Sequence, residues 1–476
     1  MSFFDGFDRI KAFTEVGEAT DKVKRNKTNA FTLEDIRIHT ASKKEGPDGI
    51  NLSGQWQAFE LFEDIFNVNV SGTLLVTDSQ NFLETGPIIG QEIMRIKLST
   101  PGFDGETVSV TKFFRIYKIS ERVIDDNGKV QQYKLHFITE DAFVNLKSKC
   151  NYSLTNMPID FMIYDIWSKH FNGSLNYSTE GGDNLKQFGP PTEGNYTFVL
   201  PTKTPFGCIK WLTHRARSSY NSADCSYVFY QDFDGYKLDT LMNLIKKPIA
   251  MDGFYEYKIK NVTAETARTT KQLSVIPEKV HFESEDDKLL ETRGGMYASA
   301  IYTYDILTKQ YTSNWHNYFE HFKELTKDTS AEKMFPVLSE SGLKPEEDIA
   351  TLIHYHPSST GNIGIVSLDD VNESGFNFDN DNYKDWVLKR TSLEYQFRSN
   401  KIILSHVAGN SNRRIGDTVM LEYPAPRPIR EDEEYNDKYI SGKYLVTSVR
   451  HLVTRQDYVM NLELSRNFYP ESLPTG

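Results

Sequence analysis

Between residues 31 and 140, hydrophobic and polar positions alternate in six consecutive runs. Alternation with a period of two is typical of a β-strand with one buried face. The last two runs flank Asn127-Gly128, a dipeptide that strongly favours a tight hairpin turn. The spacing therefore predicts antiparallel strands that close into a small barrel or sandwich. The runs are FTLEDIRIHT, GQWQAFELFED, FNVNVSGTLLVTD, QEIMRIKLST, FFRIYKISERVID and QQYKLHFIT.

After residue 141 the hydrophobic positions recur at helical spacing instead. Pro158 fits the first turn of one predicted helix, and Thr204-Pro205 begins a second. The run YVFYQDF then predicts a strand, and a third helix around 238–245 should end at Pro248. Residues of about 145–275 are thus predicted to form an α/β region. The apolar face of the first helix carries Ile159, Met162, Ile163, Ile166 and Phe171.

Strand-like runs return after Gly294-Gly295, beginning with the Tyr-rich MYASAIYTYDILT. Residues 326–384 lack periodicity and are rich in Ser, Asp, Asn and Pro, so we interpret them as an insertion. A helix is predicted from Trp386 onward, followed by strands in SNKIILSHVAGN and GDTVMLEYPAP. An amphipathic helix is also predicted behind a Ser313 cap, with its apolar face formed by Trp315, Tyr318, Phe319, Phe322 and Leu325.

The chain closes on a predicted hairpin within residues 439–467. Two alternating runs, 443–453 and 458–465, flank the polar turn Thr454-Arg455-Gln456-Asp457. One face of the second run is apolar and should lie in a core, whereas the other face is more polar. The apolar face carries Tyr458, Met460, Leu462 and Leu464, and the other face carries Val459, Asn461, Glu463 and Ser465.

Composition supports a β-rich protein, because 13% of the 476 residues are aromatic and Tyr and Phe favour strands. The net charge of −12 argues against a surface that coats nucleic acid. Three widely separated cysteines, Cys150, Cys208 and Cys225, form neither a disulfide framework nor a zinc motif. No apolar run reaches the length of a membrane span, so we expect no membrane anchor. The composition fits a protein made in a cytosol.

The sequence offers weak candidates for chemistry, each with a plainer interpretation. His354 and His356 could share a strand face as metal ligands, but no third ligand is identifiable. Residues 379–382 resemble the start of a calcium loop, yet Lys384 stands where that loop needs Gly. The acidic runs 283–287 and 431–434 are typical of solvated faces, and Cys208 and His214 should point to different helix faces. We therefore predict no catalytic, metal or cofactor-binding residue, and no enzymatic activity.

Several stretches, taken in order, resemble the central baseplate hub protein of contractile-tailed phages of the T-even type. That family is related to late-control hub proteins and to spike hubs of type VI secretion systems. The resemblance covers most of residues 31–325 and 385–467. It rests on WQAFELFEDIFNVNVSGTLLV, Gly86-Pro-Ile-Ile-Gly90-Gln-Glu, LPTKTPFGCIKWLTHRA, YVFYQDFDGYKLDTLMNLI, GGMYASAIYTYDILTKQY, GDTVMLEYP, and YISGKYLVTSVRHLV with YVMNLELSRN.

The resemblance implies a mainly β chain with two tube-type antiparallel β-barrels, an intervening α/β region and an insertion. It also implies a homotrimer whose barrels form a pseudo-sixfold ring around a channel for DNA, joining the sixfold tail tube to the threefold cell-puncturing spike. The implied partners are the spike protein, the tube protein, other baseplate proteins and the tape measure, with DNA only in passage. Synthesis in the bacterial cytoplasm and a place in the baseplate of the virion tail follow from the same family.

Pattern and resemblance together divide the chain into an N-terminal arm with the first barrel (1–145), an α/β region (146–280), an insertion (326–384) and a discontinuous second barrel (281–325 with 385–476). The residues expected to shape the barrels or touch a neighbour are Trp56, Gly72, Gly90, Gly442, Tyr444, Tyr458, Met460, Leu462 and Leu464. Two other functions remain open: an extracellular glycan- or host-binding β protein, and a hydrolase that uses an unrecognised carboxylate pair.

Overall fold

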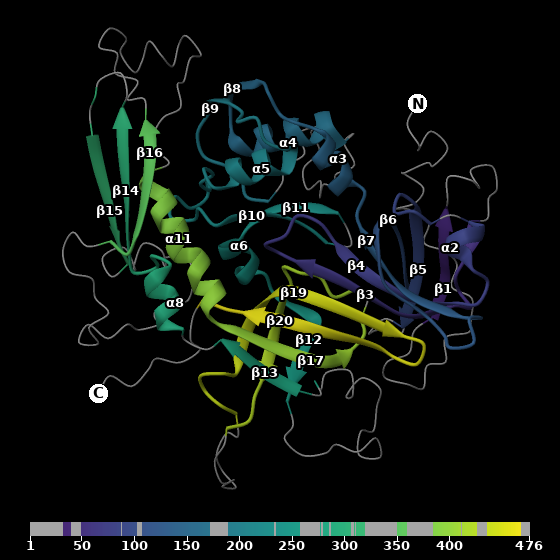
Figure 1. The fold of residues 1–476 in the computed structure, drawn as a ribbon. Coiled ribbons are helices and arrows are strands. Elements are labelled where there is room, and N and C mark those ends of the chain that lie inside the picture. Colours follow the sequence, from purple (N-terminus) through teal and green to yellow (C-terminus); the bar gives the residue numbers. More distant parts are fainter. Residues whose placement is uncertain are drawn as a thin grey trace.

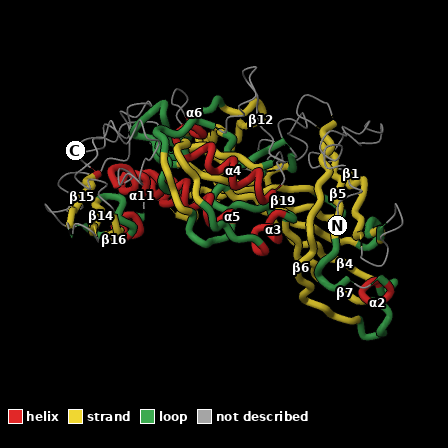
Figure 2. Tube along the Cα trace, turned by 90° about the horizontal axis from the view of Figure 1, so that it is seen from above, coloured by secondary structure: helices red, strands yellow, loops and turns green. Residues whose placement is uncertain are grey.

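The computed structural model is mainly β, as the sequence predicts (Figure 1). It describes residues 32–39, 49–86, 88–101, 107–171, 189–232, 235–257, 277, 279–284, 287–305, 309, 311–318, 350–358, 384–410, 412–425 and 436–467. Seen from above, the N-terminal strands lie at one end, α4 and α5 near the middle, and a small three-stranded sheet at the other end (Figure 2). Among the described helices, none is long and apolar enough to cross a membrane.

The N-terminal strands confirm the six predicted runs and add one short strand. The hairpin between the last two strands turns at Asn127-Gly128, where Gly128 adopts a φ of 65° and its N–H bonds the Asp125 carbonyl at 2.7 Å. Two short helices accompany the strands. The elements are β1 (Thr32–His39), β2 (Ile50–Asn51), β3 (Trp56–Asp64), β4 (Ser71–Asp78), α2 (Phe82–Thr85), β5 (Ile93–Pro101), β6 (Thr107–Ile124), β7 (Gln131–Ile138) and α3 (Asp141–Lys147).

The α/β region contains the three predicted helices and the predicted strand, together with three strands that were not predicted. Thr204 and Thr240 cap two of its helices, each accepting a hydrogen bond from the backbone N–H three residues later. Leu238, predicted in the third helix, lies instead in a strand that precedes it. The elements are β8 (Ser153–Met157), α4 (Ile159–Phe171), β9 (Tyr196–Val199), α5 (Pro205–Thr213), β10 (Tyr227–Gln231), β11 (Tyr236–Thr240) and α6 (Leu241–Lys246). An aromatic core of Trp167, Phe171, Phe206, Phe229 and Tyr236 joins the helices to β10 and β11.

The C-terminal part contains the predicted long helix, the predicted strands and the closing hairpin. Its elements are β12 (Ile249–Glu256), β13 (Lys279–Ser284), α8 (Lys288–Arg293), β14 (Ala298–Asp305), β15 (Tyr311–Asn317), β16 (Leu352–Ser358), α11 (Lys384–Ser399), β17 (Lys401–Ala408), β18 (Thr418–Glu422), β19 (Gly442–Thr454) and β20 (Tyr458–Ser465).

One continuous sheet connects the two ends of the chain. In it, β19 pairs with its hairpin partner β20, with β18, and with β3 from the N-terminal strands. We call β1–β7 the N-terminal strand group, β12, β13 and β17–β20 the C-terminal strand group, and the antiparallel β3–β19 pairing the seam. The seam runs from Ser448 opposite Asp64 to Thr454 opposite Ala58. The two strand groups predicted as separate barrels therefore share a sheet.

The prediction of a helix after Ser313 is wrong, because the described residues 311–317 form a strand. Ser313 and Trp315 belong to β15, which pairs with β14 along its whole length. The run also alternates with a period of two, and sheet pairing satisfies its backbone groups in place of a helix. Phe319, Phe322 and Leu325 lie outside the described residues.

The sheet that contains β15 is separate from the continuous one. β14 pairs with β15 on one side and, in parallel, with β16 on the other. β14 was predicted to return into the second barrel, and β16 falls within the predicted insertion 326–384. In Figure 1 this three-stranded sheet stands beside α11, away from the C-terminal strand group. The exact limits of the predicted domains stay a prediction.

Candidate assembly site

The residues predicted to shape the barrels lie mostly in the interior. Tyr458, Met460, Leu462 and Leu464 are at most 1% exposed, as predicted for the inner face of the hairpin. Ser465, assigned to the polar face, is also fully buried and donates to the Phe397 carbonyl. Trp56 and Tyr444 are buried too. These side chains stabilise the sheet from its buried side. That any of them touches a neighbouring molecule stays a prediction.

The three predicted glycines differ in what they permit. At Gly72 on β4, a Cβ would lie 2.1 Å from the Glu60 carbonyl oxygen and close to the Phe137 ring, so only glycine fits there. Gly90 (φ 89°) and Gly442 (φ 145°) adopt backbone conformations that favour glycine. Gly442 begins β19, so its conformation lets the chain bend into the seam strand.

Side chains reinforce the seam along its length. Arg450 on β19 pairs with Glu60 on β3 at 2.9 Å. At the tip of the hairpin, Arg455 Nε donates to the Trp56 carbonyl at 2.7 Å. Ser448 Oγ donates to the Glu63 carbonyl at 2.9 Å. Because charged and polar groups from both strands meet in register, the closing hairpin is held against the N-terminal strand group by more than the backbone ladder.

A buried polar cluster lies in the middle of the seam. Glu63 Oε1 is 3.4 Å from His451 Nε2, and His451 Nδ1 is 2.8 Å from the Tyr458 hydroxyl. All three side chains are at most 1% exposed. Burial raises the pKa of Glu63, the nearby His451 imidazole partly offsets this effect, and burial also raises the pKa of Tyr458. A polar cluster of this kind favours one register of the two strands, because a slip would leave its members unpaired.

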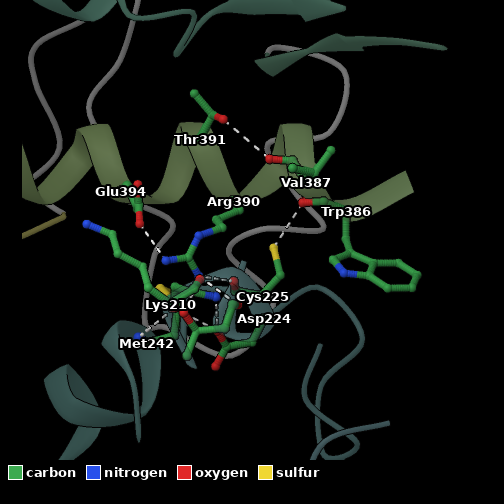
Figure 3. A network of polar contacts seen from close by, with 11 residues as sticks. Lys210, Asp224, Cys225, Met242, Trp386, Val387, Arg390, Thr391 and Glu394 are labelled. Atoms are coloured by element: carbon green, nitrogen blue, oxygen red, sulfur yellow. Dashed lines mark hydrogen bonds and ion pairs between the residues drawn. The ribbon is translucent and has the colours of Figure 1, made fainter. Parts of the chain in front are cut away.

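A second network fastens α11 to the α/β region (Figure 3). Arg390 points from α11 toward the end of α5 and the loop before β10. It donates to the Thr213 carbonyl of α5 at 3.4 Å and to the Cys225 carbonyl of the loop at 2.9 Å. It also pairs with Glu394 at 2.6 Å. Burial opposes the Glu394 charge, but Arg390 and then His214 outweigh burial and hold the pKa of Glu394 below its usual value. Long-range contacts of this kind set the position of α11 relative to the α/β region.

One exposed surface is unusually aromatic. Tyr302, Tyr304, Tyr311, Trp315 and Tyr355 share one side of the β15–β14–β16 sheet, and we call this side the aromatic face. Tyr302 lies at its centre, with ring centroids 5.5 Å from Tyr311 and Tyr355 and 5.9 Å from Trp315. Tyr304, Tyr311, Trp315 and Tyr355 are 46%, 60%, 38% and 76% exposed.

The opposite side of the same sheet is covered by α11. His316 is buried there, with its Nε2 3.0 Å from Ser392 Oγ, and Gln396 Nε2 donates to the Tyr318 hydroxyl at 3.4 Å. Since α11 is itself anchored by Arg390, the aromatic face is presented on a rigid support. Large exposed apolar patches of this kind mark contact sites for other molecules.

The weak candidates for chemistry do not gather into a site in the part of the chain that is described. There, no three His, Cys, Asp or Glu side chains are placed to hold a metal ion. His354 is half-buried on β16, and burial lowers its pKa. Asp287 caps α8 by accepting from the Leu290 N–H at 2.9 Å. Residues 379–382 and 431–434 lie outside the described residues.

Cys208 and His214 diverge as predicted. Cys208 Sγ donates to the Pro201 carbonyl at 3.3 Å, whereas His214 lies beside Arg390 and Glu394. Burial, reinforced by the charge of Arg390, lowers the pKa of His214.

Three features of the structure escaped prediction: the Arg390 network, the aromatic face and the seam. Arg390 belongs to the helix predicted from Trp386 onward. Its position between Leu388 and Leu393, which are buried, was the signal in the sequence that Arg390 is buried too. The aromatic face could have been predicted if residues 311–317 had been assigned to a strand. Tyr302 and Tyr304 would then share one side with Tyr311, Ser313 and Trp315. The seam had no local signal, because its strands lie at opposite ends of the chain.

Comparison with known proteins finds a relative that aligns over most of the chain. No family model matches the chain. The sequence is 22% identical over 411 residues to the probable baseplate hub protein gp334 of Vibrio phage KVP40, an alignment that spans 85% of this chain and 88% of that protein.

Similar solved structures include a tail protein from Neisseria meningitidis (TM-score 0.49, 9% identity, 92% of this chain and 99% of that one). A 43 kDa tail protein of prophage MuSo2 from Shewanella oneidensis is another (TM-score 0.45, 12% identity, 91% and 98%). A Francisella PdpA–VgrG complex is a third (TM-score 0.43, 11% identity, 98% and 62%). The chain is thus a relative of a phage protein named as a baseplate hub protein, which confirms the resemblance found in its sequence.

Proposed function

We propose that this chain is a structural component of the hub of a phage tail baseplate, located in the virion after synthesis in the host cytoplasm. The observation that carries the proposal is the relative named as a baseplate hub protein, because the similarity extends over 85% of this chain and 88% of that one. A similarity that extends over nearly the whole length of both chains supports a shared role better than a similarity limited to one domain. The role proposed is one of assembly and not of catalysis.

We further propose that three copies form a ring. Each chain contributes an N-terminal and a C-terminal strand group, so three chains would supply six strand groups around a channel, matching a sixfold tube on one side and a threefold spike on the other. The seam supports this, since two groups that share a sheet keep a fixed relative orientation. A net charge of −12 suits a channel wall that releases DNA in passage.

Contacts between copies need additional surface, and the aromatic face is the best candidate for one of them. Its four most exposed rings present about 400 Å², at roughly 200 Å² for each fully exposed aromatic side chain. A stable interface buries about 800 Å² from each partner, so this face would supply about half of one contact between two copies. The spike protein, the tube protein, other baseplate proteins and the tape measure are the further partners proposed.

Size-exclusion chromatography with light scattering tests the ring directly. The full chain should run as a trimer, and co-expression with the spike and tube proteins of the same phage should give a complex that contains all three proteins. A clean monomer at micromolar concentration that also fails to bind either partner would contradict the proposal. Retention of glycans on an array by such a monomer would favour the glycan-binding alternative instead.

A further inference from the structure

The N-terminal strand group has a basic outer side. On its strands β1 and β5, Arg37 lies opposite Arg95, and Asp35 lies opposite Lys97. Residues paired in this way project from the same side of a sheet. The other side is the core, because the alternate residues are buried: Ile36, Ile38, Met94, Ile96 and Leu98. The charged side is therefore the outer one.

The same side continues across β6 and β7. Arg115 lies opposite Ile138, and Lys118 lies opposite His136 on the same strand β7. Lys134 projects from that side as well, since it is two residues from His136. We call this side the basic face. Its cations are Arg37, Arg95, Lys97, Arg115, Lys118 and Lys134, and the carboxylates beside them are Asp35, Glu121 and Glu140.

The carboxylates of the basic face are too few to neutralise its cations. Asp35 alone serves two guanidinium groups, with Oδ1 2.8 Å from Arg37 Nε and Oδ2 3.8 Å from Arg95 Nη1. Six cations against three carboxylates leave an excess of three positive charges on this face. The rest of the chain, whose total charge is −12, therefore carries −15.

Two histidines on the basic face lie in its positive field. Burial, and then the charges of two neighbouring arginines, lowers the pKa of His39. Burial, and then the charges of two neighbouring lysines, lowers the pKa of His136. Tyr117 adds an aromatic ring 6.0 Å from the His136 ring, and its side chain is 45% exposed. Arginine and tyrosine are among the side chains that most often anchor contacts between proteins.

We propose that the basic face of one copy docks against an acidic surface of a second copy, an inference that rests on the several copies of the proposed ring. Charge complementarity within one sequence carries it, because the face is positive and the rest of the chain is strongly negative. A contact between two different surfaces is heterologous, which is the kind that closes a ring of three. The strands of the face lie at one end of the molecule, where a second copy can approach them (Figure 2).

Duplex DNA is the other polyanion that a basic face attracts. A chain through which DNA passes must not hold it, so the proposed function favours carboxylates of a protein as the partner.

Zero-length crosslinking of the full-length protein locates the contact. A carbodiimide joins a lysine amine to a carboxylate with loss of water, and covalent monomers and dimers are then separated on a denaturing gel and mapped by mass spectrometry. Lys134 and Glu121, 3.0 Å apart in one chain, supply the internal control, because their link should appear in the monomer band. We expect Lys97 and Lys118 in links found only in the dimer band.

The outcomes separate this inference from the ring itself. Dimer-band links that involve other residues but neither Lys97 nor Lys118 would overturn the docking of the basic face and leave the ring standing. Protein that is monomeric by light scattering and gives no dimer band would contradict both.

Salt and charge reversal test the sign of the contact. Screening shortens from about 10 Å at 0.1 M salt to about 3 Å at 1 M, so the trimer should dissociate about tenfold more readily at the higher concentration. Lys97→Glu with Lys118→Glu should weaken the trimer about tenfold or more at 0.1 M salt. Lys147→Glu with Lys149→Glu is the matched control, because it changes the net charge equally on two exposed residues of another region.

A trimer that is insensitive to salt, or that both double variants weaken equally, would overturn the proposal. Binding of short duplex DNA that the first double variant loses, with its trimer unchanged, would assign the face to phosphate groups instead. If that variant does not fold, the crosslink map of the unmodified protein still decides.

Discussion

Glu63 on β3 lies 3.4 Å from His451 on β19, inside the seam that joins the two strand groups. Both side chains are at most 1% exposed, so a carboxyl group and an imidazole from opposite ends of the chain meet in the interior. Tyr458 closes the cluster by contacting the other ring nitrogen of His451. The relative position of the two strand groups therefore depends on a buried polar contact as well as on the backbone ladder.

The burial of Glu63 predicts a specific pH dependence. Its pKa is raised above the ordinary 4.5, so at pH values above 4.5 the folded chain binds a proton that the unfolded chain has already lost. The free energy of unfolding should therefore fall as pH rises through this interval. Glu63→Gln lacks the titration, so the melting temperature of the wild type relative to this variant should fall as the pH rises above 4.5. A difference that stays constant with pH would contradict the assignment.

Leu462 tests the inner face of the closing hairpin. It is fully buried on β20, so Leu462→Asp places a charge in the core and should lower the free energy of unfolding by about 3 kcal/mol or more. Asn461→Asp is the matched control, because its side chain lies on the half-buried opposite face and keeps an oxygen that can accept the His406 N–H. Denaturant unfolding should separate the two variants, and equal losses would mean that the faces are assigned wrongly.

The sequence was most informative where local pattern and final pairing agree. The six N-terminal runs, the Asn127-Gly128 turn and the inner face of β20 were predictable, because each is decided by neighbouring residues and one buried face. The resemblance to baseplate hub proteins also came from ordered local motifs.

Long-range pairing was not predictable from the same patterns. Trp315 fits a helical face and a strand face equally well, and the choice depends on β14 being available as a partner. The seam likewise depends on β19 meeting β3 from the other end of the chain, a pairing that no local period encodes. The aromatic face likewise became visible only when three strands were placed side by side.

Arg390 should be essential for the attachment of α11. Arg390→Ala leaves the Cys225 and Thr213 carbonyls and the Glu394 carboxylate without their donor, at a cost of about 3 kcal/mol. Hydrogen exchange should rise in α11 and in the loop before β10. Arg390→Lys should recover only part of the loss, because an ammonium group cannot serve all three acceptors with the geometry of a guanidinium.

A matched control separates this network from a general effect of removing charge on α11. Lys389→Ala removes the charge of the neighbouring side chain, which is only half-buried and takes no part in the three contacts of Arg390. Its hydrogen exchange should resemble that of the wild type. If Lys389→Ala and Arg390→Ala behaved alike, the attachment of α11 would depend on net charge and not on the three contacts of Arg390.

Tyr355 tests whether the aromatic face is a contact between copies. Its ring is 76% exposed, so Tyr355→Ser should change the free energy of unfolding by less than about 0.5 kcal/mol. An aromatic anchor in an interface contributes more than about 1 kcal/mol, so the same substitution should weaken the trimer about tenfold. Tyr220→Ser is the control, because Tyr220 is 77% exposed and belongs to the loop between α5 and β10, not to this sheet. Light scattering over a dilution series should show earlier dissociation for Tyr355→Ser alone, and identical dissociation curves for both variants would remove the aromatic face from the interface.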